Sequence, residues 1–127
     1  MSATSSVWIL KWLDGLFFVF HTGLILFVLL GWIRRPLLGA HLFVLLLTGF
    51  SWFILGLRYG IGYCPCTDWH WEIRRRLGDS DLPYSYVQFL LSQLGLDVGA
   101  KTADVLAGTV FFAALGVSLI RNFQTRR

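Results

Sequence analysis

Two long runs without a charged residue constrain this chain more than any other feature. The first extends from Gly15 to Ile33 and the second from Leu37 to Leu57. At 1.5 Å of rise per residue, about nineteen helical residues nearly cover the roughly 30 Å hydrocarbon core of a bilayer. A helix also satisfies its own backbone polar groups in lipid, where no water is available. The runs therefore predict an all-α, polytopic membrane protein.

The composition points in the same direction. Of the 127 residues, 56% are hydrophobic and 14% are charged, with a mean hydropathy of +0.65. A soluble domain carries about a quarter charged residues. The length suits a single membrane domain, residues 1–127. The net charge of +4 is typical of headgroup contacts in a membrane protein, and no nucleic-acid module occurs. We expect the lipid bilayer, and not nucleic acid, as a partner.

Three transmembrane spans are predicted, at about residues 13–33, 37–58 and 103–120. Arg34-Arg35-Pro36 separates the first two spans, and two charges followed by a proline predict a tight turn that closes a helical hairpin. Thr102 is a suitable N-cap for the third span.

Small residues recur at helical spacings in the second and third spans. Such residues let the backbone of a neighbouring helix approach closely. The pattern predicts packing faces at Gly49, Gly56 and Gly60, at Ala103 and Ala107, and at Ala114 and Ser118.

The segment 62–100, between the second and third spans, is predicted to lie at the membrane interface. Thr67 is suited to cap a short amphipathic helix, and Gly78 is suited to end it. An apolar face and a basic face that reaches toward headgroups are expected, formed by Trp69, Ile73 and Leu77 on one side and by Arg74 and Arg75 on the other.

A second amphipathic stretch, residues 85–94, follows in the same segment. Its polar stripe and its apolar stripe are separated at helical spacing. Ten residues are too few to cross a bilayer, so we expect an interfacial or re-entrant helix, and a fourth crossing stays open.

The charges differ between the two sides that three spans would define. One side carries five arginines and no acid, namely Arg34, Arg35, Arg121, Arg126 and Arg127. The other side carries six Lys/Arg and all seven acids. Net charge favours the arginine side as cytoplasmic, although the positive-inside rule counts Lys and Arg, five against six. The predicted orientation is N-terminus outside and C-terminus inside.

Two cysteines and a histidine lie close together in the middle segment. Cys64, Cys66 and His70 form a Cys-x-Cys-x-x-x-His pattern, with Asp68 and Glu72 nearby. Thiolate and imidazole are ligands that zinc and copper favour, and Cys66 and His70 share one side of a helix that begins early enough. The cysteine spacing is tighter than in zinc knuckles, and no fourth ligand is evident. Either a metal site or apolar cysteines at the membrane edge fits the pattern.

The Cys-Pro-Cys pair also has a redox interpretation. A disulfide between Cys64 and Cys66 could exchange with other thiols, with a quinone as electron sink. The arginines at 74 to 76 would favour the thiolate that attacks. A ring across so few atoms would be strained, and the sequence holds no second cysteine pair to relay electrons.

His21 and His41 are candidate cofactor-binding residues within the first two spans. A haem held by both would need them at one depth, but they differ by on the order of 12 Å along the helix axes. A haem with one ligand, or a quinone bonded to His21, stays open. Each histidine is alternatively an interior polar residue bonded to a neighbouring helix. Asp14 shares a face with His21, and a proton relay between them is a hypothesis.

Several short motifs resemble a family of small bacterial membrane proteins, domain of unknown function 2784. They include His21, Phe27-Val28-Leu29 with Gly31, His41-Leu42, Cys64-Pro65-x-Thr67, the arginines at 74 to 76 with Gly78, and the stretch from Tyr84 to Phe89. The chain departs from the family pattern at Cys66, where a leucine is usual, and at His70, where an acid is usual. The resemblance implies a bacterial membrane protein and implies no activity.

No catalytic set accompanies these features. The sequence holds no Ser/His/Asp set, phosphate-binding loop, paired catalytic carboxylates or His-Glu-x-x-His motif. We therefore expect a non-catalytic protein of the bacterial inner membrane, an accessory or assembly subunit of a complex with other membrane proteins. The alternative is a redox or metal-binding membrane protein that uses Cys64, Cys66 and His70, or one with a haem or quinone at His21.

Overall fold

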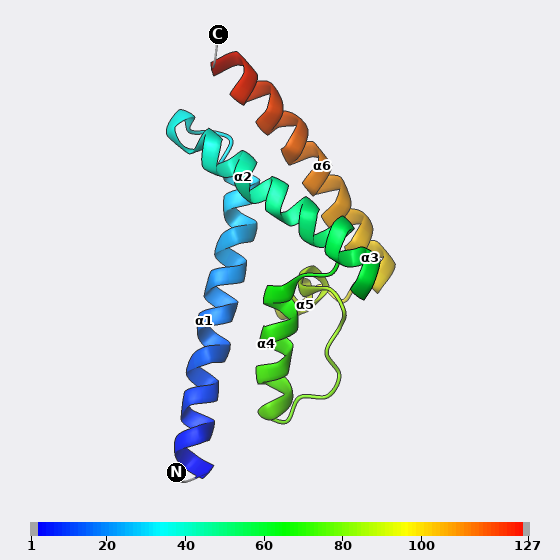
Figure 1. The fold of residues 1–127 in the computed structure, drawn as a ribbon. Coiled ribbons are helices and arrows are strands. Elements are labelled where there is room, and N and C mark those ends of the chain that lie inside the picture. The colour runs from blue at the N-terminus through cyan, green and yellow to red at the C-terminus, as the bar shows by residue number, and fades with distance from the viewer. Residues whose placement is uncertain (1–2, 126–127) are drawn as a thin grey trace.

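The described part of the chain is helical throughout, as predicted. A computed structural model describes the backbone of residues 3–125 and side chains from residue 6, so Arg126 and Arg127 lie outside it. No strand occurs in that range (Figure 1). The elements are α1 (Ala3–Leu30), the 3-10 turn η1 (Arg35–Leu37), α2 (Leu38–Gly49), the π-helix η2 (Phe50–Leu55), α3 (Gly56–Tyr59), α4 (Pro65–Arg76), α5 (Tyr86–Gln93) and α6 (Ala100–Thr125).

Three helical segments within residues 3–125 are long and apolar enough to cross a membrane. They are Ser6–Leu30, Arg35–Tyr59 and Ala100–Thr125. Their number agrees with the prediction and indicates a multi-pass membrane protein. The helix that contains the predicted third span, 103–120, is longer at both ends, and Thr102 lies inside it and is not its cap. The carbonyl oxygen of Gly99 already accepts a helical hydrogen bond from Ala103 N at 3.0 Å.

The turn between α1 and α2 forms where the two arginines and the proline predicted it. Gly31 is buried there, and a Cβ atom at this position would lie 2.6 Å from the carbonyl oxygen of Phe27 and 2.9 Å from Cδ2 of His41. His41 Nε2 donates to the carbonyl oxygen of Val28 at 2.9 Å. The hairpin is thus closed by a close backbone approach and by one buried histidine, which bonds a neighbouring helix as one interpretation predicted.

The second span changes its winding before it ends. Phe50–Leu55 forms a π-helix, and the chain after it folds back onto this turn. The amide of Gly62 donates to the carbonyl oxygen of Trp52 at 3.0 Å, and Ser51 Oγ donates to the carbonyl oxygen of Tyr63 at 2.7 Å. The π-turn thus offers one backbone carbonyl and one side-chain hydroxyl to the returning chain. The loop that leads to α4 is therefore anchored to the second span.

The predicted glycine packing face is only partly correct. Gly49 meets α6, since a Cβ there would lie 3.3 Å from Phe111 Cζ. Gly60, however, ends the helix with a φ of +112°, a conformation that favours glycine. Gly56 faces the returning chain at Ile61 Cα, at 3.0 Å, and not a second helix. The two later glycines therefore serve the reversal of the chain.

Helices α2 and α6 pack against each other along the outer part of the fold (Figure 1). Leu45 of α2 is buried with Phe111 and Ala114 of α6. The predicted small-residue face of α6 is buried at Ala103, Ala114 and Ser118 and half-buried at Ala107, and Ala114 packs in the cluster with Leu45. Close approach through small side chains explains this contact.

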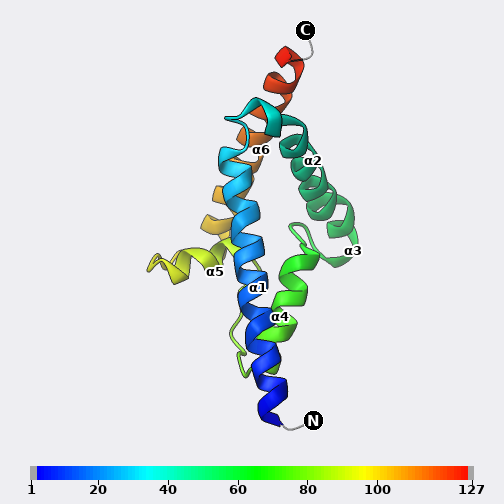
Figure 2. The same ribbon diagram turned by 90° about the vertical axis from the view of Figure 1, so that its left-hand side faces the viewer.

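Helix α4 runs beside the N-terminal half of α1, in the opposite direction (Figures 1 and 2). It begins at Pro65 with Cys64 as N-cap, and not after Thr67, because proline at the first helical position costs no hydrogen bond. Helix α5 crosses near the middle of α1, and Ser85 caps it through a bond from Gln88 N at 3.4 Å. With eight residues, α5 is too short for a fourth crossing.

Candidate functional site

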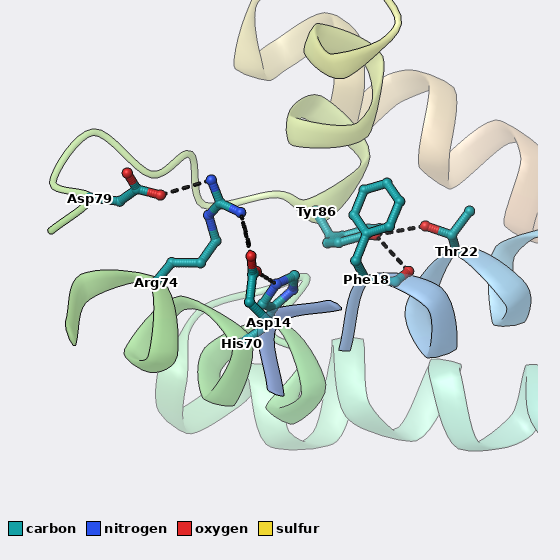
Figure 3. A network of polar contacts seen from close by, with 7 residues as sticks. All are labelled: Asp14, Phe18, Thr22, His70, Arg74, Asp79 and Tyr86. Atoms are coloured by element: carbon teal, nitrogen blue, oxygen red, sulfur yellow. Dashed lines mark hydrogen bonds and ion pairs between the residues drawn. The ribbon is translucent and has the colours of Figure 1, made fainter. Parts of the chain in front are cut away.

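Asp14 of α1 is the centre of a polar cluster that joins three segments (Figure 3). Its Oδ1 accepts hydrogen bonds from His70 Nε2 at 2.6 Å and from Arg74 Nη1 at 3.1 Å. His70 and Arg74 lie one turn apart on α4 and so face α1 together. The His70 side chain is fully buried, whereas those of Asp14 and Arg74 are 27% and 24% exposed. The cluster is therefore largely buried, but Asp14 and Arg74 remain partly accessible to solvent.

The position of Asp14 explains why it needs these partners. Sixteen residues separate it from Leu30 at the end of α1, which corresponds to about 24 Å of helix. This length is less than the roughly 30 Å thickness of the hydrocarbon core. A carboxylate so close to lipid is costly unless it is paired. The guanidinium of Arg74 supplies the opposite charge, and His70 supplies a second donor.

Arg74 extends the cluster beyond α1 and α4. Its Nη2 lies 2.7 Å from Asp79 Oδ2 in the turn after α4. The guanidinium carbon also lies 4.9 Å from the centre of the Phe89 ring of α5, in a cation–π contact. One side chain therefore ties α4 to α1, to the following turn and to α5.

A second set of contacts joins α5 to α1 one to two turns further along. The Tyr86 ring stacks on His21, with the ring centres 3.8 Å apart and the planes 15° from parallel. The Tyr86 hydroxyl donates to the carbonyl oxygen of Phe18 at 3.3 Å and lies 2.7 Å from Thr22 Oγ1 (Figure 3). Burial raises the pKa of Tyr86 above its ordinary value of 10.0, so the hydroxyl keeps its proton.

The predicted basic face of α4 was wrong for Arg74, which was expected to turn toward headgroups and instead points to Asp14. Trp69, expected on an apolar face at the membrane interface, is 62% exposed within the chain, which does not contradict that expectation. The buried residues are Thr67, His70 and Trp71. The prediction for Arg74 failed because α4 packs on α1 with His70 and Arg74 bonded to the Asp14 carboxylate. Arg75 and Arg76 are exposed and pair with Glu72.

The structure does not assemble the predicted metal site. Helix α4 starts early enough to place Cys66 and His70 on one side, but His70 Nε2 is bonded to Asp14. No group of three or more His, Cys, Asp and Glu side chains in the described residues is placed to hold a metal ion. Cys64 and Cys66 are free thiols.

The thiol chemistry of Cys66 also differs from the prediction. Burial, followed by the neighbouring Cys64, raises the pKa of Cys66 to about 11. The expected effect of the arginines, a favoured thiolate, is outweighed because only Arg74 turns inward and Asp14 and Asp79 bind it. At pH 7 roughly one Cys66 thiol in ten thousand is ionised.

The two candidate cofactor histidines are not brought together. His41 is fully buried and bonds Val28, which lies seven residues beyond His21 on α1, or about 10 Å along the axis. His21 stacks on Tyr86 instead. Its buried Nδ1 has no hydrogen-bond partner among the described residues. The structure also gives Asp14 other partners than His21, namely His70 and Arg74.

Sequence reasoning missed the pairing of Asp14 with α4. A signal was present, because an acid at the edge of a span needs a compensating group, and His70 and Arg74 stand four residues apart. The pattern could not say which of the three arginines and the one histidine in the segment 62–100 pairs with Asp14. Chemically, the cluster uses the carboxylate oxygens and both donors to hold helices together.

Replacement of Asp14 by asparagine should test this role. Asp14→Asn keeps the shape but removes the charge, which leaves Arg74 and His70 without their anion at the membrane edge. We expect the free energy of unfolding to fall by about 1–3 kcal/mol, because the donors of His70 and Arg74 lose their charged acceptor. The measurement is the melting temperature in a single detergent.

Glu72→Gln is the matched control for this substitution. It removes one carboxylate from α4 whose partners Arg75 and Arg76 are exposed, so the loss should stay below about 0.5 kcal/mol. Equal shifts for the two variants would contradict a special role of Asp14.

The pKa of Cys66 predicts the pH dependence of its alkylation. In a Cys64→Ser variant Cys66 is the single thiol, and burial, the larger cause of its raised pKa, remains. Only the thiolate reacts, so the rate with iodoacetamide should still rise above pH 9. A rate that levels off by pH 9 would show an ordinary thiol, and the variant without both cysteines gives the background.

The chain was compared with protein families, curated proteins and solved structures. No curated protein and no solved structure matches it. Residues 11–123 match the family model described as Protein of Unknown function (DUF2784). This range includes all three spans in large part, together with Asp14, His70 and Arg74. The chain therefore belongs to the DUF2784 family.

Proposed function

We propose that this protein is a non-catalytic accessory or assembly subunit of a membrane protein complex in the bacterial inner membrane. The bacterial setting is supported by the resemblance of its motifs to small bacterial membrane proteins. The polar side chains of the described part are largely bonded within the fold. The proposed role therefore rests on the exposed small and apolar residues of the spans.

The observation that carries this proposal is an open stripe of small residues on α6. Thr109 and Ala113 are exposed, and a Cβ at Gly116 would meet nothing within 4 Å. Helical spacing places the three on one face, away from the buried Ala114 and Ser118. Small residues at such spacing allow a second helix to pack closely in lipid, and glycine within a helix is otherwise unfavourable.

The exposed apolar surface of α1, which other parts of the chain hardly bury, supports the same proposal. No residue in the most apolar window of this helix is buried within the chain. Large side chains such as Leu16, Val19 and Phe20 are between 59% and 70% exposed. Lipid and partner helices are the surroundings that such a surface fits.

The redox and metal alternative has no comparable support. His70 is bonded to Asp14, and the pKa of Cys66 is raised to about 11. A thiol that is protonated at neutral pH is a poor nucleophile. We therefore keep the subunit role as the proposed function.

Photo-crosslinking in native membranes tests the partner face. A diazirine amino acid at Ala113 lies on the open stripe, whereas one at Leu119, which is 50% exposed, lies on a different face of α6. We expect a discrete protein adduct from Ala113 after irradiation and lipid adducts from Leu119. Identical adducts from both positions, or lipid adducts alone from Ala113, would contradict the proposal.

We propose an orientation with the N-terminus outside, because the arginine end carries no acid. Both native cysteines are first replaced by serine. Ser80→Cys or Gln124→Cys, introduced separately, then places a single exposed thiol at one end or at the other. A membrane-impermeant maleimide added to intact cells should label the first and not the second. The reverse pattern would invert the topology.

A further inference from the structure

Three arginines lie at the end of the fold that is opposite the N-terminus. Arg34 and Arg35 occupy the turn between α1 and α2, and Arg121 lies near the end of α6. Figures 1 and 2 place this turn and the end of α6 at the same end of the molecule. Arg121 Nη2 donates to the carbonyl oxygen of Ile33 at 3.4 Å. Its guanidinium therefore lies against the turn that carries the other two.

The scaffold below these arginines is held in place. Asn122 Nδ2 donates to the carbonyl oxygen of Leu38 at 3.0 Å, which fixes the end of α6 to the start of α2. His41 fixes α2 to α1 through Val28, at 2.9 Å, next to the tightly packed Gly31. A preformed arrangement loses little entropy when a ligand binds. The arginines are thus presented together by a rigid end of the hairpin.

No acidic side chain of the described residues pairs with the positive charge at this end. The sequence holds no Asp or Glu between Gly15 and Thr67 or after Asp104. The ion pairs within residues 6–125 lie elsewhere, between Asp14, Glu72 or Asp79 and side chains of α4. Arg34 and Arg35 are both exposed. Exposed guanidinium groups without a carboxylate are suited to bind an anion from outside the chain.

The surroundings indicate which anion this is. The cluster stands at the ends of apolar spans, beside the exposed Trp32, Ile33 and Leu37. Tryptophan is enriched where a membrane protein meets the headgroups. A phosphate there presents oxygens that a guanidinium fork binds with two hydrogen bonds, and its acyl chains would lie along the apolar helix faces.

We propose that Arg34, Arg35 and Arg121 form a binding site for the phosphate headgroup of an anionic phospholipid. Each basic residue near the membrane surface contributes about fivefold to the affinity for anionic lipid. The site binds such a lipid in preference to a zwitterionic one. It goes beyond the subunit role, because it concerns the lipid and not a protein partner.

The test counts the lipids that the full chain retains when a mixed bilayer is removed. The protein is placed in nanodiscs of phosphatidylcholine with a minor fraction of phosphatidylglycerol. The nanodiscs are then dissolved, and native mass spectrometry counts the lipids that remain bound. We expect phosphatidylglycerol to be enriched over its bulk fraction. The triple variant Arg34→Gln, Arg35→Gln, Arg121→Gln should lower this enrichment by on the order of tenfold or more.

A matched triple variant removes the same charge from the other end. Arg58→Gln, Arg75→Gln, Arg76→Gln should keep the enrichment, because these side chains lie away from the proposed site. The double variant Arg34→Gln, Arg35→Gln leaves the bond from Arg121 to Ile33 intact and should lower retention at an unchanged melting temperature. This variant separates lost binding from lost folding.

The outcomes that overturn the proposal are distinct. One is a wild-type protein that shows no enrichment, and another is an equal loss in both triple variants, which would indicate net charge alone. Inorganic phosphate added to the protein in detergent should change neither the melting temperature nor the lipid count. If phosphate raises the melting temperature as strongly as phosphatidylglycerol does, the site binds a soluble anion and the lipid assignment fails.

Discussion

The carboxylate of Asp14 is the interaction on which the lower half of this structure depends. An acid near the hydrocarbon core is tolerable only with a partner, and α4 provides two donors one turn apart, His70 and Arg74. Once they face α1, the direction of α4 and its distance from α1 are set. Arg74 then holds the next turn through Asp79 at 2.7 Å. Loss of one member leaves another charge unpaired, which costs more than the pair itself contributes.

The polar side chains of the described part are engaged mainly with its own backbone. Trp71 Nε1 donates to the carbonyl oxygen of Pro83, Tyr86 to that of Phe18, and Asn122 to that of Leu38. The last two bonds join helices that also touch through apolar side chains, Phe18 with Phe89 and Leu45 with Phe111. In lipid, hydrophobic burial does not drive helices together, so such bonds and close packing must do so. Much of the apolar surface, that of α1 above all, stays uncovered within the chain and is left for lipid and partner helices.

The two ends of the fold differ in chemistry, and this difference links the architecture to the proposals. One end combines acids, bases and aromatic rings in a network that is internally paired, as at Arg74. The other end presents Arg34, Arg35 and Arg121 without an acid. Paired charges stabilise the fold, whereas unpaired ones remain available to the membrane surface. The stripe around Ala113 lies on α6 between these ends and faces outward.

The amino-acid sequence by itself determined the helical class, the number of spans and the hairpin turn at Arg34-Arg35-Pro36, because these follow from local length, polarity and proline chemistry. It also marked His21, His41, Cys64, Cys66 and His70 as residues of interest. Only the tertiary structure decided what they contact. The sequence could not show that α4 lies along α1, since the partners Asp14 and His70 are 56 residues apart. Helical periodicity identifies faces, but which face is buried depends on what the neighbouring helix presents, and here that was a carboxylate.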